Sequence, residues 1–93
     1  MPTVNLLIKG KTQGVFYRAK AKEKADVLGV TGWIKNIPEG RVEAMVTGSQ
    51  LQLDAFIDWC KKGTEKSEVS EVIVTPLGDH LYNEFTVIRE NDL

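Results

Sequence analysis

Cysteine and histidine are scarce in this chain of 93 residues, which contains one of each, Cys60 and His80. A single cysteine excludes an internal disulfide and a thiolate metal cluster. A single histidine excludes a metal site with several histidine ligands. We therefore expect no metal ion and no other cofactor. Cys60 falls on the apolar stripe of a predicted helix and is expected in the core, and His80 is expected to be a surface residue rather than a catalytic base.

An excess of charge of either sign is also absent. Twelve basic and 13 acidic residues give a formal net charge of −1. A dedicated nucleic-acid binder needs a basic excess to neutralise phosphates, so we expect no nucleic-acid partner. No apolar run is long enough to span a bilayer, and the first residues lack the pattern of a signal peptide. The expected setting is the cytoplasm, without a membrane partner, and the sequence demands nothing more than a monomer.

The chain is short enough to form one domain, residues 1–93, around one core. Alternation and helical periodicity of apolar residues predict the following elements. Strands are expected over residues 3–9, 30–36, 41–47 and 69–75, helices over 17–28 and 50–62, and a short last strand over 85–89. Residues 76–79 are expected to end the fourth strand, and residues 91–93 to be frayed.

This order of elements is the ferredoxin-like βαββαβ arrangement of the α+β class, with a short extra strand at the end. Two helices would lie on one face of an antiparallel sheet. Strands one and three would be central neighbours, with strand two paired to strand three through a hairpin. The loop after strand one and the end of strand two, at Asn36, could therefore approach each other.

The stretch between the first strand and the first helix, residues 10–18, has the sequence GKTQGVFYR. Gly10 and Gly14 allow the backbone to curl, so that several N–H groups can point at one spot. A helix N-terminus adds unpaired donors and the positive end of a dipole. Arg18, in the first helical turn, can bind phosphate oxygens in bidentate fashion. The stretch therefore predicts an anion site suited to phosphate.

The two helix starts differ in how their N–H groups can be satisfied. Ser49 and Gln52 form a capping box at the second helix. The first helix has no capping side chain at Gly14, Val15 or Phe16, so water or a ligand must take its donors. Glycine-flanked turns that bind nothing are common, and that alternative stays open on spacing alone. Asn36, before a turn, is likewise an ordinary turn residue by itself.

Two stretches together resemble the acylphosphatase family. The family pattern G-x-V-Q-G-V-x-F-R matches residues 10–18, and G-W-V-x-N matches residues 32–36. Further matches cover nearly the whole chain: residues 28–30, 40–43 and 85–89. Thr12 replaces the usual valine. Tyr17 replaces the usual phenylalanine, so its hydroxyl needs a partner or a route to water.

The resemblance implies a metal-independent hydrolase that cleaves acyl phosphates to a carboxylate and inorganic phosphate. Carried over by motif, Arg18 binds the phosphoryl group and Asn36 positions the attacking water. The backbone cradle would be formed by the N–H groups of Gln13, Gly14, Val15, Phe16, Tyr17 and Arg18.

Hydrolysis of an acyl phosphate needs few catalytic groups beyond these. A carboxylate leaves without protonation near neutral pH, so no general acid is needed, and positioning with electrostatic stabilisation can carry phosphoryl transfer. Two alternatives remain. One is a phosphate-binding module without turnover that uses the same loop. The other is an RNA-binding ferredoxin-like domain, which sparse aromatic residues and near-neutral charge disfavour.

Overall fold

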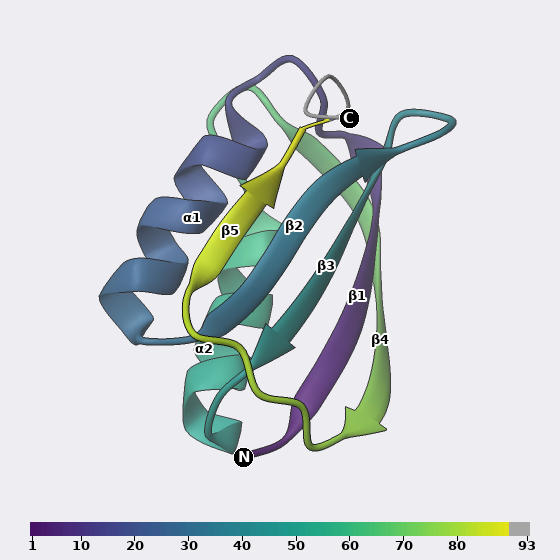
Figure 1. Cartoon of the computed structure of the whole chain (residues 1–93). Coiled ribbons are helices and arrows are strands. Elements are labelled where there is room, and N and C mark those ends of the chain that lie inside the picture. Colours follow the sequence, from purple (N-terminus) through teal and green to yellow (C-terminus); the bar gives the residue numbers. More distant parts are fainter. Residues whose placement is uncertain (90–93) are drawn as a thin grey trace.

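The computed structural model describes residues 1–89 of the chain, which form two helices and a five-stranded sheet (Figure 1). The elements, in chain order, are β1 (Thr3–Lys11), α1 (Tyr17–Leu28), β2 (Thr31–Ile37), β3 (Arg41–Thr47), α2 (Gln50–Lys62), β4 (Glu68–Gly78) and β5 (Phe85–Ile88). The expected order of elements is confirmed, and α1, α2 and β3 have the expected bounds. The expected fraying of residues 91–93 lies outside the described residues.

The strand order in the sheet is β4-β1-β3-β2-β5. As expected, β1 and β3 are central, and β2 pairs with β3 through the hairpin. These pairings and that of β1 with β4 are antiparallel, whereas β5 lies parallel to β2. The expectation of an antiparallel sheet therefore fails at its last strand, and the sheet is mixed. A parallel neighbour requires a crossover, and the chain enters β5 after passing back across the sheet from β4.

Both helices cover one face of the sheet and enclose the core (Figure 1). Alternating residues of the strands point at this face, as their burial shows for Leu6 and Ile8 of β1. Helix α1 buries Tyr17, Ala21 and Ala25. Helix α2 buries its own apolar stripe: Leu53, Phe56 and Cys60. Cys60 is thus a core residue, as expected.

Strand β4 runs further than the sequence predicts. It begins at Glu68 and continues through Pro76 to Gly78, where a break was expected after residue 75. β4 lies at the edge of the sheet, and an edge strand tolerates proline because one side of its backbone has no neighbour to bond. The pairing shifts register between Thr3 and Val4, opposite this segment. Within the described residues, no helix is long and apolar enough to cross a membrane.

Candidate active site

The loop between β1 and α1 has an unusual backbone that glycine alone does not account for. Gly14 has a φ of 76°, as its expected role in curling the backbone requires. Phe16 also adopts the left-handed conformation, with φ 60° and ψ 20°, although a bulky residue rarely does so. Its side chain is 77% exposed. Residues with strained backbone are common at functional sites, which makes this loop a candidate for one.

The N-terminus of α1 is open, as the sequence predicts. In the described part of the chain, no side chain caps this helix, whose N-cap residue is Phe16. At α2, by contrast, the Ser49 side chain accepts a hydrogen bond from the Gln52 N–H, and the Gln52 side chain accepts one from the Ser49 N–H. The expected capping box is confirmed. The first N–H groups of α1 therefore remain available to an anion.

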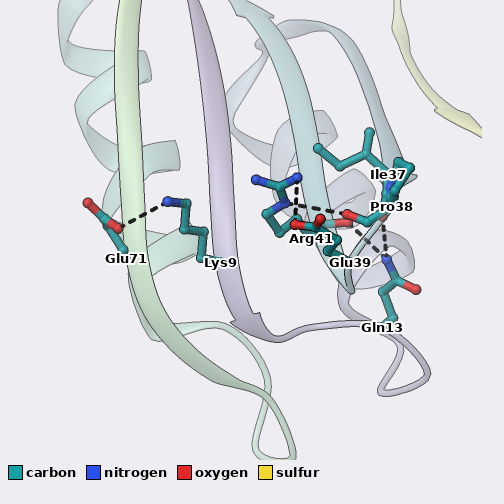
Figure 2. Close-up of polar contacts among 7 residues, drawn as sticks. All are labelled: Lys9, Gln13, Ile37, Pro38, Glu39, Arg41 and Glu71. Atoms are coloured by element: carbon teal, nitrogen blue, oxygen red, sulfur yellow. Dashed lines mark hydrogen bonds and ion pairs between the residues drawn. The ribbon is translucent and has the colours of Figure 1, made fainter.

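Side-chain hydrogen bonds fix this loop to the β2–β3 hairpin. Figure 2 shows the Gln13 amide nitrogen donating to the carbonyl oxygens of Ile37, at 3.1 Å, and Arg41, at 2.9 Å. The buried Thr12 hydroxyl donates to the Gly40 carbonyl at 3.4 Å. The loop after β1 and the end of β2 thus lie together, as the strand order predicts. Thr12, which departs from the family pattern, uses its hydroxyl for this attachment.

The same view shows two surface ion pairs. Lys9 of β1 pairs with Glu71 of β4 at 3.6 Å, and Arg41 pairs with Glu39 across the turn at 3.2 Å (Figure 2). Exposed pairs of this kind contribute little to stability. They show that the side chains of Lys9 and Arg41 are each paired with a carboxylate.

Arg18 lies in the first turn of α1, on the wall of a cavity of about 310 Å³. Its Nη1 donates a hydrogen bond to the Ile88 carbonyl at the end of β5, at 3.2 Å. Arg89 lines the same cavity, so two arginines border one space. The lining residues are Thr12, Gly14, Phe16, Tyr17, Arg18, Ala19 and Arg89. Sequence reasoning missed Arg89, because only the parallel placement of β5 beside β2 brings the end of the chain to the loop.

Asn36 lies near the end of β2, one residue before the carbonyl that Gln13 bonds. Its backbone partner in β3 is Val42, which is buried in the core, and Ile34 precedes it on the same face of β2. The Asn36 side-chain oxygen is buried and has no hydrogen-bond partner among the described residues. Buried polar atoms are nearly always satisfied in folded proteins, so an orphaned one calls for an explanation.

Tyr17 is almost fully buried, and its hydroxyl has the partner that the sequence requires. It donates a hydrogen bond to the Cys60 carbonyl in the last turn of α2, at 2.8 Å. Burial is the main reason that the pKa of Tyr17 lies far above its usual range. Burial also raises the pKa of the Cys60 thiol, to about 12. Both groups are therefore neutral near pH 7, and the hydrogen bond from the Tyr17 hydroxyl joins α1 to α2.

His80 and the possible metal-ligating side chains do not form a further site among the described residues. His80 is exposed, and its backbone groups bond the hydroxyls of Thr3 and Thr47. Among residues 1–89, no group of three or more histidine, cysteine or acidic side chains is placed to hold a metal ion.

Sequence comparison with known proteins identifies one family. A sequence model of the Acylphosphatase family matches residues 4–87. An acylphosphatase of Marinobacter nauticus is 49% identical over 78% of this chain and 79% of its own length. An acylphosphatase of Methylococcus capsulatus is 40% identical over 97% of this chain and 99% of its own length. The full-length match leaves no large segment of that relative without a counterpart here.

The fold is similar to that of solved acylphosphatases. The crystal structure of the Bacillus subtilis acylphosphatase superposes with a TM-score of 0.88 at 30% identity, covering 95% of this chain and 99% of that one. A crystal structure of full-length HypF contains a similar unit, with a TM-score of 0.82 at 22% identity. That unit covers 12% of the HypF chain and shows likeness of fold alone.

Proposed function

Because this chain belongs to the acylphosphatase family and is an acylphosphatase, a hydrolase of acid anhydrides, we propose how its residues divide the reaction. The loop from Gln13 to Arg18 holds the phosphoryl group of an acyl phosphate. Asn36 positions the water that attacks it. The observation that carries this proposal is the orphaned side-chain oxygen of Asn36, at the end of the strand to which the loop is attached.

The phosphoryl group is held by backbone and guanidinium together. The uncapped N-terminus of α1 supplies free N–H donors and the positive end of the helix dipole. Arg18 adds a fixed positive charge on the cavity wall. In the free enzyme its guanidinium is held by the Ile88 carbonyl, so it is already placed before substrate arrives. Preplaced donors stabilise developing charge without reorganising at the moment of reaction.

Asn36 serves the nucleophile. Its buried amide oxygen lacks a donor within the described residues, and a water O–H supplies one. Holding the water at the phosphorus removes much of the entropic barrier to attack. The Gln13 hydrogen bond to Ile37 fixes the adjacent residue of β2 relative to the phosphate loop, so that the two halves of the site keep their spacing.

The atoms of the reaction balance without a further reagent. The water oxygen forms a bond to phosphorus while the bond between phosphorus and the acyl oxygen breaks. The electron pair of that bond leaves with the carboxylate, and the two water hydrogens end on phosphate oxygens. Because a carboxylate leaves without protonation, no general acid is required, and the exposed position of His80 is consistent with this. The transition state is loose, so binding and positioning carry the catalysis.

Substrate choice tests this proposal. The enzyme is expected to hydrolyse acetyl phosphate and benzoyl phosphate rapidly, with inorganic phosphate as a competitive inhibitor. It should be a poor catalyst for p-nitrophenyl phosphate, whose leaving group is a poorer one than a carboxylate. Comparable kcat/KM values for the ester and the acyl phosphates would contradict the proposed mechanism.

We also propose that the chain acts as a single domain and a monomer in the cytoplasm. One core joins all the elements of residues 1–89, and the lone cysteine is buried and free. Unpaired cysteine suits a reducing compartment. Light scattering at assay concentrations tests the monomer, with a mass near 10.4 kDa expected.

A further inference from the structure

A second cavity, of about 340 Å³, lies against the phosphate loop. Val15 and Phe16 of the loop form one wall, and Trp59 of α2 forms another. Phe16 also lines the cavity that contains Arg18, so this residue borders both spaces. We propose that this second cavity, called here the acyl pocket, binds the acyl group of the substrate and selects aromatic or branched acyl phosphates. This inference rests on the proposed function of the loop.

The acyl pocket has an apolar part formed by Val15, Phe16 and Trp59, which hydrogen bonds and ring contacts hold in place, and a charged rim formed by Lys20, Glu65 and Lys66. Trp59 packs against the buried Tyr17 ring, with ring centroids 5.2 Å apart, and against Phe56. The Thr64 hydroxyl donates to the Val15 carbonyl at 3.2 Å, which joins the loop to the segment after α2. Ligand pockets are typically preformed and mostly apolar, in the size range of this cavity. The acyl pocket is therefore ready before substrate binds.

The exposure of Phe16 has no explanation in the fold. Phe16 is 77% exposed and has a positive φ. Both the exposure of an aromatic ring to water and the left-handed backbone are unfavourable in free energy. Binding of an apolar acyl group beside the ring would remove part of its surface from water. The volume is that of a small-molecule site and suits a single aromatic ring rather than a protein surface.

The acyl pocket and Asn36 belong to different elements of the fold. β1, which leads into the loop, has β4 on one side and β3 with β2 on the other. The acyl pocket lies at the end of α2 and the start of the connection to β4, whereas Asn36 lies on β2. Attacking and leaving oxygens are roughly in line in phosphoryl transfer. The proposal therefore requires that the water at Asn36 and the acyl group in the pocket lie on opposite sides of the bound phosphoryl group.

The two tryptophans of the chain allow a matched kinetic test. Trp59→Leu is expected to lower kcat/KM for benzoyl phosphate about tenfold relative to acetyl phosphate, because an aromatic contact and its buried area are lost. Trp33→Leu makes the same replacement on β2, in a different cavity, and should leave that ratio unchanged. An unchanged ratio in Trp59→Leu would overturn the acyl pocket.

A binding measurement covers the case in which Trp59→Leu fails to fold. In Trp33→Leu, Trp59 is the remaining tryptophan. Benzoylphosphonate, which has a stable carbon–phosphorus bond, should change Trp59 fluorescence saturably, and inorganic phosphate should reverse the change by competition. If benzoylphosphonate competes with phosphate but Trp59 fluorescence stays constant, the acyl group binds elsewhere. Failure of the proposed function would look different, because Arg18→Ala would then still hydrolyse both acyl phosphates.

Discussion

The side-chain amide of Gln13 donates a hydrogen bond to the carbonyl oxygen of Ile37 at 3.1 Å. The bond crosses from the phosphate loop to the end of β2, and the residue before Ile37 is Asn36. The same amide nitrogen also bonds the Arg41 carbonyl, at 2.9 Å, on the other strand of the hairpin (Figure 2). One side chain thus connects the group proposed to hold the phosphate with the group proposed to hold the water.

Gln13→Ala should weaken the enzyme more than it weakens the fold. Loss of two exposed hydrogen bonds is expected to lower the free energy of unfolding by about 1 kcal/mol. A small misplacement of Asn36 relative to the loop is expected to lower kcat by about tenfold or more. Urea unfolding and acyl phosphate hydrolysis measure the two effects. Gln50→Ala is the control, since Gln50 makes one exposed bond to Asp54 on α2 and should leave kcat unchanged. Unchanged kcat in Gln13→Ala would show that the attachment has no role in turnover.

Arg18→Ala should strongly reduce both turnover and inhibition by phosphate. The guanidinium carries the charge that faces the phosphoryl group, and loss of such a group costs roughly a hundredfold to a thousandfold in kcat. Lys24→Ala removes one positive charge from the same helix and is expected to leave both properties in place. Steady-state kinetics with inorganic phosphate as inhibitor measure the difference. An active Arg18→Ala that phosphate still inhibits would remove Arg18 from the site.

Stability should fall in alkaline solution because of the buried contact between Tyr17 and α2. The pKa of Tyr17 lies well above its usual value of 10.0 in the folded protein, and that of Cys60 rises from 9.0 to about 12. Groups with raised pKa values stabilise the fold fully below their unfolded pKa, and this stability is lost as the pH rises above it. Each group contributes a slope of about 1.4 kcal/mol per pH unit in that window.

Urea unfolding between about pH 8 and about pH 11 should therefore show a decline that begins near pH 9. Tyr17→Phe should lower stability at neutral pH by about 1 kcal/mol, because the hydrogen bond to the Cys60 carbonyl is lost. Its decline above pH 10 should be shallower than that of the wild type. Equal slopes in the two proteins would show that Tyr17 does not ionise on unfolding in this range.

Chelation should leave the enzyme fully active. Across residues 1–89, the histidine, cysteine and acidic side chains are not grouped in a way that could hold a metal ion. Acyl phosphate hydrolysis after dialysis against EDTA is therefore expected to equal that of the untreated enzyme. Loss of activity that added metal restores would contradict the proposed roles of Arg18 and the backbone.

Much of the fold follows from local patterns in the sequence. Alternation in β1 and the 3.6-residue period of α2 identify core residues such as Leu6 and Phe56, and both are buried. The predicted end of β4 was wrong, because Pro76 would break a central strand but is tolerated in an edge strand. Whether a strand lies at the edge depends on the tertiary structure and cannot be read from the local sequence. The parallel pairing of β5 with β2 also depends on the tertiary structure, so the local sequence did not predict it.

The candidate site, like the fold, could be predicted from the sequence only in part. The loop, its open helix N-terminus and the approach of β2 follow from glycines, missing caps and strand order. The side-chain partners do not, because they depend on distances between residues far apart in the chain. Gln13 was expected to contribute its backbone N–H alone, yet its amide attaches the loop to the hairpin. Arg89 reaches the cavity of Arg18 only through the placement of β5.

The division of roles between Arg18 and Asn36 is tested most directly by Asn36→Ala. Phosphate inhibition should persist, since the loop and Arg18 are intact, while kcat should fall by roughly a hundredfold or more. Stability should be unchanged or slightly higher, because the substitution removes a buried oxygen that has no partner among the described residues. Kinetics, phosphate inhibition and urea unfolding on the same preparation give the answer. Equal loss of phosphate binding, turnover and stability would instead make Asn36 a structural residue and contradict its proposed role.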